Sequence, residues 1–188
     1  EIIVVDGNST DKSQEILKKY KSKIKLIIKK DKSMYQAINR GMDLAKGKYV
    51  TYCNSDDFYL NKNFLKNLEK KIKTKNYEVI FCGGKIYDEK NKVIRKVVPK
   101  SISKKEIITL GLPSIQNGIF WKNSKLRFNL KYYVCSDYDF FCQLVFRANK
   151  FLFYKKISVG FTKRADSFGS LNHNRGIAEI KKIKNFYR

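Results

Sequence analysis

Acidic side chains stand at three points of the sequence where a hydrophobic run stops or an apolar-periodic segment begins. They are Asp6, the turn Asn54-Ser55-Asp56-Asp57, and the pair Asp137 and Asp139. A carboxylate at the end of a buried strand projects into the crevice beyond the sheet, where α/β proteins bind their ligands. Such carboxylates can hold a divalent cation, accept a hydrogen bond from a hydroxyl, or remove a proton.

The turn at residues 54–57 has the composition of a cation site. Mg²⁺ and Mn²⁺ bind proteins through one or two carboxylates, together with phosphate oxygens and water. The alternative is a helix N-cap, since aspartate after a strand often caps the helix that follows. The residues of this turn, taken alone, leave both interpretations open.

The other two acidic positions have similar alternatives. Asp6 could accept from a ribose hydroxyl or a base N–H, or it could stabilise its own turn. Asp137 and Asp139 are two residues apart at the start of a predicted helix, so their side chains point in different directions and only one can face a substrate. Helix capping explains this pair equally well.

Strands and helices alternate in the first half of the chain and position these acids. Hydrophobic runs predict strands at residues 1–6, 25–29, 49–53 and 79–82, and apolar residues at helical spacing predict helices at 16–20, 34–45 and 64–72. This order predicts an α/β fold with a mostly parallel sheet flanked by helices.

After residue 83 the pattern changes to a small antiparallel addition. Residues 85–87 and 93–98 flank the polar turn 88–92 as a hairpin does. The later predicted elements are strands at 118–121, 151–154 and 158–161 and a helix at 137–148. Residues 1–188 contain no linker or repeat, so we expect a single catalytic domain.

The sequence resembles the family 2 glycosyltransferases of the GT-A fold, particularly the bacterial branch that builds surface polysaccharides. The resemblance rests on EIIVVDGNSTD (1–11), MYQAINRG (34–41), AKGKYV (45–50), NSDD (54–57) and SDYD (136–139). These motifs follow the family's order over most of the chain. The resemblance implies an inverting, metal-dependent enzyme that transfers a sugar from a nucleotide-sugar donor, with a UDP-sugar as the default, to a glycan or lipid-linked acceptor in polysaccharide biosynthesis.

The resemblance also implies roles for individual residues. Asp6 would contact the nucleoside and Asn39 would lie near the nucleotide. Residues 54–56 would occupy the family's DxD position, with Asn54 and Ser55 beside the donor and Asp56 as the ligand of Mn²⁺ or Mg²⁺. Asp137 would be the catalytic base that takes the proton from the acceptor hydroxyl.

The sequence departs from the family's pattern at several places. The family begins with an earlier strand and helix, so we expect this catalytic domain to be N-terminally incomplete. Asn54 replaces the first acid of a strict DxD, which should weaken metal binding. Gln116 stands where the related branch often has a histidine. Lys32 and Arg40 could add positive charge near the phosphates, and His173, the only histidine, is a candidate late metal ligand.

The charge of the chain bears on its partners. Lysine and arginine number 41 against 17 acids, a formal net charge of +24, which favours phosphates of nucleotides, nucleic acid or anionic lipid. Two alternative functions are therefore a basic nucleic-acid-binding module and an inactive membrane-associated scaffold. The nucleic-acid alternative is disfavoured because no nucleic-acid-binding motif accompanies the positive charge. A basic nucleic-acid-binding protein also has no need for acidic side chains at the three positions described above.

Cysteine usage and hydropathy bear on location. The four cysteines form no CxxC pair, which indicates a reducing compartment, and no apolar run approaches the roughly 20 residues that span a bilayer. We expect a cytoplasmic enzyme with a possible peripheral membrane contact. The basic segment 177–188 could rest on anionic lipid through Ile177, Ile180 and Ile183, or it could pack on the core as an ordinary surface helix.

Overall fold

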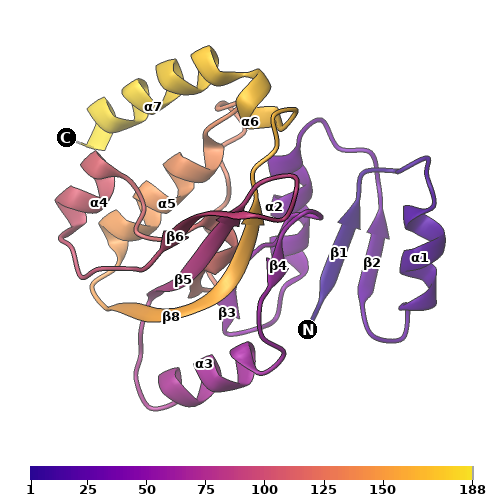
Figure 1. Ribbon diagram of the computed structural model, residues 1–188, viewed down its shortest axis with the longest axis horizontal. Coiled ribbons are helices and arrows are strands. Elements are labelled where there is room, and N and C mark those ends of the chain that lie inside the picture. The colour runs from indigo at the N-terminus through magenta and orange to yellow at the C-terminus, as the bar shows by residue number, and fades with distance from the viewer. Residues whose placement is uncertain (188) are drawn as a thin grey trace.

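A parallel pair of strands opens the chain in the computed structural model, which describes residues 1–187 (Figure 1). β1 (Ile3–Asp6) and β2 (Lys25–Ile28) pair in parallel and are joined by α1 (Ser13–Lys19). This pair forms a sheet of its own, and α2 (Met34–Leu44) packs on β1. The three elements agree with the alternation of hydrophobic runs and helical spacing in residues 1–45.

The remaining strands form one six-stranded sheet. They are β3 (Tyr49–Val50), β4 (Phe58–Tyr59), β5 (Val79–Tyr87), β6 (Val93–Val97), β7 (Ile119–Lys122) and β8 (Phe151–Thr162). The strand order is β3-β7-β5-β8-β4, and β6 pairs with β5 as the predicted hairpin. β5 and β8 are parallel, whereas every other pair in this sheet is antiparallel.

The expectation of a mostly parallel sheet is therefore wrong, and the sheet is mixed. β3, β5 and β8 point the same way, as the alternation predicts, but β7 is inserted between β3 and β5 in the opposite direction. β7 follows the 3-10 turn η1 (Gln116–Gly118) and not a crossover helix, so its direction is not constrained to be parallel. The two strands predicted at 151–154 and 158–161 are one continuous strand, β8.

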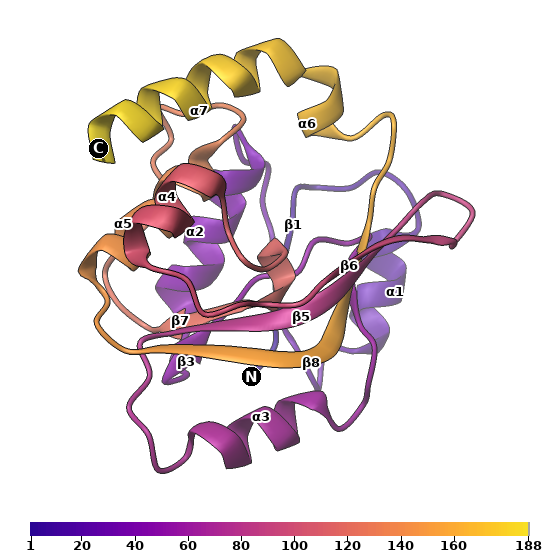
Figure 2. The same ribbon diagram turned by 60° about the vertical axis from the view of Figure 1, so that its left-hand side comes forward.

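An irregularity in the pairing of β5 with β8 explains why the sequence of β8 looked interrupted. The register shifts on both sides of Gly83, opposite residues 155–157. A Cβ atom at Gly83 would lie 2.9 Å from the carbonyl oxygen of Lys156, so only glycine fits this close approach of two backbones. The bulge bends β8, which Figure 2 shows as a curved ribbon beneath β5.

Helices cover both faces of the six-stranded sheet (Figure 2). α3 (Phe64–Ile72) lies on one face, and its Phe64 and Leu68 pack against Ile80 and Phe120. The other face carries the larger core, centred on Trp121. The helices on that face are α2, α4 (Lys104–Leu110), α5 (Ser136–Arg147) and α7 (His173–Tyr187), and the short α6 (Phe168–Leu171) precedes α7.

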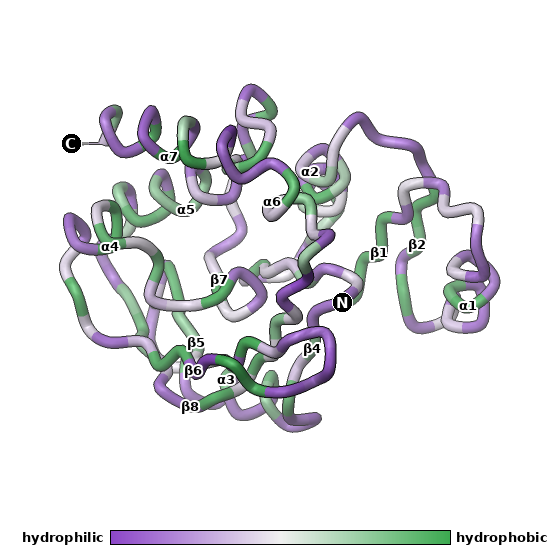
Figure 3. The backbone as a smooth tube through the Cα atoms, turned by 45° about the horizontal axis from the view of Figure 1, so that its top comes forward, coloured by the Kyte–Doolittle hydropathy of each residue, from purple (hydrophilic) through white to green (hydrophobic). Residues whose placement is uncertain are grey.

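Helix α7 packs on the core with the isoleucines that had been considered for a membrane contact. Ile183 is fully buried and Ile180 is half-buried, whereas Ile177 is 54% exposed. Along α7 the hydropathy alternates between hydrophilic and hydrophobic residues (Figure 3). Of the two alternatives for this segment, the structure therefore supports the helix packed on the core, because the core covers Ile183 and part of Ile180. Among residues 1–187, no helix has the length and apolar character to span a bilayer.

Candidate functional site

The acidic turn lies between β3 and β4, at the edge of the six-stranded sheet. The N–H of Asp57 donates to the carbonyl of Asn54 at 3.1 Å, which closes the turn. The Thr162 hydroxyl donates to the carbonyl of Asp56 at 2.9 Å and ties the turn to the end of β8. Ser55 and Asp56 are exposed, and Asn54 is half-buried. These hydrogen bonds fix the backbone of the turn, and the Asp56 side chain is exposed to solvent.

Asp57 has a buried carboxylate. Neither of its oxygens makes a hydrogen bond of normal geometry within residues 1–187, although Asn54 and the backbone of Thr162 lie close enough to lower its pKa. Burial, together with the neighbouring charge of Asp56, raises the pKa of Asp57 to about 7. A divalent cation held at this turn by Asp56 and Asp57 would stabilise the ionised form of both carboxylates.

Asp56 and Asp57 are the two acids of the turn, and Asp56 is the exposed one. No group of three or more His, Cys, Asp or Glu side chains with metal-holding geometry occurs in the described part of the chain. A cation at the turn would therefore complete its shell with phosphate oxygens and water. That is the mode of binding preferred by Mg²⁺ and Mn²⁺, so the residues fit such an ion.

Asp137 occupies the first turn of α5 and is half-buried. Its Oδ1 accepts from the N–H of Tyr138 at 2.8 Å and lies 3.2 Å from the Tyr35 hydroxyl. Its Oδ2 lies 3.4 Å from the Gln116 Nε2. Burial raises the pKa of Asp137, against the opposing effect of these donors. The carboxylate is thus oriented from three sides and more basic than an exposed aspartate, which suits a proton acceptor.

Asp139 points away from Asp137, as its position two residues later on the helix predicts. Its side chain is buried, accepts from Gln143 Nε2 at 2.9 Å, and lies 3.4 Å from the Tyr187 hydroxyl. The contact with Tyr187 directs Asp139 toward α7 and the interior. The two acids of this motif are therefore in different environments, and Asp137 alone approaches Gln116 and Tyr35.

Tyr52 lies near both the acidic turn and Asp137. Burial raises its pKa well above the usual value, and the charges of Asp137, Tyr35 and Asp57 raise it further. The Tyr52 ring also packs on Phe128 and Phe141 in the core. Asp57 of the acidic turn and Asp137 of α5 thus both lie close enough to Tyr52 for their charges to raise its pKa, so the fold brings these two distant stretches of sequence into one region.

Asp6 and Asn39 are held by neighbouring groups. Asp6 accepts from the N–H of Ser9 at 2.9 Å and from the Ser9 hydroxyl at 2.6 Å, and the hydroxyl in particular lowers its pKa. Asn39 makes two hydrogen bonds to the backbone of Phe128, of 2.9 and 2.8 Å. Both side chains therefore fix loops in this structure, and their contacts with a nucleotide remain predictions.

The other polar candidates are spread over the surface. Arg40 forms an ion pair of 2.6 Å with Asp31, whose side chain is almost fully buried. Lys32 and His173 are exposed. Arg40 therefore supports the loop before α2, and the fold does not bring His173 into a cluster with other metal-binding side chains within residues 1–187.

Three residues around the site were missed or left open by the sequence. Tyr35 lies in the predicted helix at 34–45 and Tyr52 in the predicted strand at 49–53, so both resemble ordinary core residues. Gln116, where a histidine was expected, lies against Asp137. Tyrosine hydroxyls at otherwise apolar positions were the available signal, because a buried hydroxyl requires a hydrogen-bond partner.

The sequence is similar to a glycosyltransferase family and to individual glycosyltransferases. The family described as Glycosyl transferase family 2 matches residues 1–150. An uncharacterized glycosyltransferase of Methanocaldococcus jannaschii is 26% identical over 160 residues, 80% of this chain and 55% of that protein. A poly(ribitol-phosphate) beta-glucosyltransferase of Bacillus spizizenii is 30% identical over 178 residues, 85% of this chain but 26% of that protein. The chain thus spans about half, or less, of the length of these curated relatives.

Solved structures show the same fold. TarS of S. aureus, residues 1–349 in complex with UDP, superposes with a TM-score of 0.74 at 18% identity, over 100% of this chain and 55% of that one. A mannosyltransferase of Pyrobaculum calidifontis in complex with GDP-Man and Mn²⁺ superposes with a TM-score of 0.65 at 12% identity, over 98% of this chain and 53% of that one. At these identities the likeness concerns the fold, which is GT-A-like.

Proposed function

The chain belongs to glycosyl transferase family 2, and from this premise we propose that it moves a sugar from a nucleotide-sugar to a hydroxyl of a glycan or lipid-linked acceptor in polysaccharide biosynthesis. The observation that carries the proposal is the environment of the Asp137 carboxylate, which contacts the Tyr138 N–H and the side chains of Gln116 and Tyr35 and is made more basic by burial. The buried carboxylate of Asp57 in the acidic turn supports it. A UDP-sugar is the donor we propose, since TarS has been solved with UDP and with UDP-GlcNAc.

The acidic turn would hold the donor's diphosphate through Mn²⁺ or Mg²⁺, with Asp56 and Asp57 as the protein ligands. When bound, the cation neutralises the charge that develops on the leaving diphosphate. Asn54 and Ser55 provide an amide and a hydroxyl beside the same turn for the donor's polar groups. The hydrogen bond from the Thr162 hydroxyl to the Asp56 carbonyl would hold the backbone of the turn in place when the diphosphate binds.

Asp137 would act as the general base. Its Oδ2 accepts the proton of the acceptor hydroxyl as that oxygen attacks the anomeric carbon, and Gln116 and Tyr35 hold the carboxylate while it does so. Attack from the face opposite the leaving diphosphate inverts the configuration at that carbon. Asp6 and Asn39 would border the nucleoside from β1 and α2. Catalysis would take place in the cytoplasm, where the four free cysteines stay reduced.

Calorimetric titration of the protein with UDP, with and without Mn²⁺, tests the proposal at the donor site. We expect binding that requires Mn²⁺ and is lost in Asp56→Asn, whereas Glu69→Gln, which removes an exposed acid of α3, binds as the unmodified protein does. Release of UDP from UDP-GlcNAc or UDP-glucose then reports turnover. Tight binding of a single-stranded oligonucleotide in the absence of UDP binding would favour the nucleic-acid module instead. Binding of neither would favour the scaffold.

A further inference from the structure

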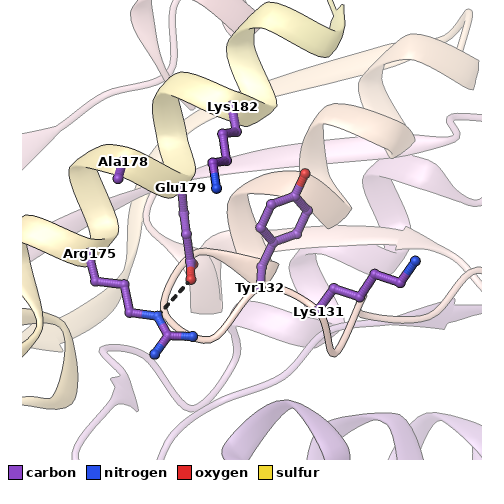
Figure 4. A pocket seen from close by; sticks show the side chains of 6 residues that line it. All are labelled: Lys131, Tyr132, Arg175, Ala178, Glu179 and Lys182. Carbon is purple, nitrogen blue, oxygen red and sulfur yellow. Dashed lines mark hydrogen bonds and ion pairs between the residues drawn. The ribbon is translucent and has the colours of Figure 1, made fainter.

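A single acidic residue of α7 binds the loop that precedes α5. Glu179 is 8% exposed, and its Oε2 accepts from the N–H groups of Val134 and Cys135 at 2.9 Å each. Its Oε1 accepts from the N–H of Tyr133 at 3.0 Å and from Arg175 at 3.1 Å. Figure 4 shows Glu179 directed from the helix toward this loop, with the Arg175 guanidinium against its carboxylate.

These hydrogen bonds use the full accepting capacity of the carboxylate. Burial alone would raise the pKa of Glu179, but the three backbone N–H groups and Arg175 outweigh it and lower the pKa. Arg175 also stacks over the Tyr133 ring at 4.3 Å from its centroid. A carboxylate so well satisfied is a firm anchor, because each oxygen would be left unpartnered if the loop moved.

The anchored loop leads directly to the proposed base. Cys135 is the N-terminal cap of α5, and Asp137 lies in the first turn of that helix. The backbone of Val134 is bound on both sides of its Cα atom. Glu179 accepts from the N–H of Val134, and the Tyr35 hydroxyl donates to its carbonyl. The same Tyr35 hydroxyl lies 3.2 Å from Asp137 Oδ1. A shift of the loop would therefore move both the helix start and the hydroxyl that orients the base.

We propose that Glu179 is a positioning residue for the transfer reaction, which fixes the start of α5 and thereby the direction of the Asp137 carboxylate. The inference rests on the proposed function only in taking Asp137 as the base. It assigns a task to the segment after residue 150, which the family match does not cover. In the sequence, Glu179 stands out as the one acid in the otherwise basic or neutral stretch 173–188.

The chain offers a matched control at the other end of α5. Glu78 accepts from the backbone N–H of Asn149 at 2.6 Å and of Lys150 at 3.0 Å, just after the helix ends. It is therefore also a carboxylate that holds a loop next to α5. Glu78→Gln and Glu179→Gln are the same chemical change. The first removes the anchor far from Asp137, and the second removes the anchor near Asp137.

The first measurement does not depend on activity. Hydrogen exchange of the amides of residues 133–135 should become faster in Glu179→Gln and stay unchanged in Glu78→Gln. NMR titration of the Asp137 carboxyl should show a changed pKa in Glu179→Gln alone. The titratable groups that face Asp137 are Tyr35, Tyr52 and the Cys135 thiol, and none of them is replaced. Unchanged exchange at 133–135, or an unchanged Asp137 titration, would overturn the inference.

The second measurement is the rate of UDP release from UDP-GlcNAc with Mn²⁺. Glu179→Gln should lower kcat by about 10- to 100-fold with little change in KM for the donor, because a small displacement of a base costs rate more than binding. Glu179→Asp should restore part of the rate, and Glu78→Gln should retain the rate of the unmodified protein. Equal losses of kcat in both glutamine variants would show a general loss of folding and refute the inference. If the unmodified protein releases no UDP, the proposed donor is wrong, and the exchange and titration results still decide on Glu179.

Discussion

Replacing Asp137 with asparagine should slow transfer strongly without loosening the fold. Asparagine keeps the oxygen that accepts from Tyr138, and its amide can pair with Gln116 once the Gln116 amide rotates. It removes the basicity of the side chain, however. Loss of a positioned general base lowers kcat by about 10²-fold or more, which corresponds to at least about 2.7 kcal/mol of transition-state stabilisation.

The stability of this variant should move in the opposite direction. Burial raises the folded-state pKa of Asp137 above the unfolded value. Between these two values the folded state holds the proton more firmly, so stability falls as the pH rises through that window, and the loss persists at higher pH. Asparagine carries no charge and avoids this loss. At neutral pH the variant should therefore unfold at the same temperature as the unmodified protein or a higher one, and its advantage should shrink as the pH falls.

Thermal unfolding followed by circular dichroism from about pH 5 to pH 8, together with single-turnover transfer, tests both parts. Asp139→Asn is the comparison, because that acid is also buried but faces Gln143 and Tyr187. It should retain most of the transfer rate. Normal transfer by Asp137→Asn would show that another residue is the base. The account of the buried charge would be contradicted if the melting temperature of the variant, minus that of the unmodified protein, were lower at pH 7 than at pH 5.

Three further outcomes are expected. Asp56→Asn should lose Mn²⁺-dependent binding of UDP in calorimetry while Glu69→Gln keeps it, and equal affinities would remove Asp56 from the metal site. Gly83→Ala should destabilise the fold by about 1 to 3 kcal/mol in urea unfolding, because its Cβ would press on the Lys156 carbonyl oxygen, and an unchanged midpoint would show that the bulge can relax. Ile183→Ala should cost about 2 to 5 kcal/mol and leave co-sedimentation with anionic liposomes unchanged, whereas loss of liposome binding without loss of stability would return this residue to a membrane face.

Local patterns predicted the helices α2, α3 and α5 well, whereas α4 and α6 were not predicted. The apolar stripes of α2, α3 and α5 follow the 3.6-residue period, and their bounds lie close to the predicted ones. The β5–β6 hairpin was also predicted correctly, because its polar turn lies between two short hydrophobic runs. The separation of Asp137 from Asp139 follows from helix geometry alone, which places residues two apart on different faces.

Features that depend on distant parts of the chain could not be predicted in the same way. The direction of β7 depends on which strands it pairs with, and its four residues carry no mark of that choice. The contact of Gln116 with Asp137 joins η1 to α5, and the anchor from Glu179 joins α7 to the loop before α5. The bulge at Gly83 depends on the backbone of β8 opposite it. Each of these requires the folded arrangement of segments far apart in sequence.

The position of β8 has a consequence for biosynthesis. β8 is the last strand within residues 1–187 and yet lies inside the sheet, between β5 and β4, with Val79 paired to Phe151. While a ribosome is still making this segment, β5 has an open edge and β4 lacks its neighbour, so the nascent sheet exposes unpaired backbone groups. Long-range parallel pairing is slow to form, and such incomplete sheets aggregate. The yield of folded protein should therefore depend on translation speed, temperature and chaperones that shield the waiting strands.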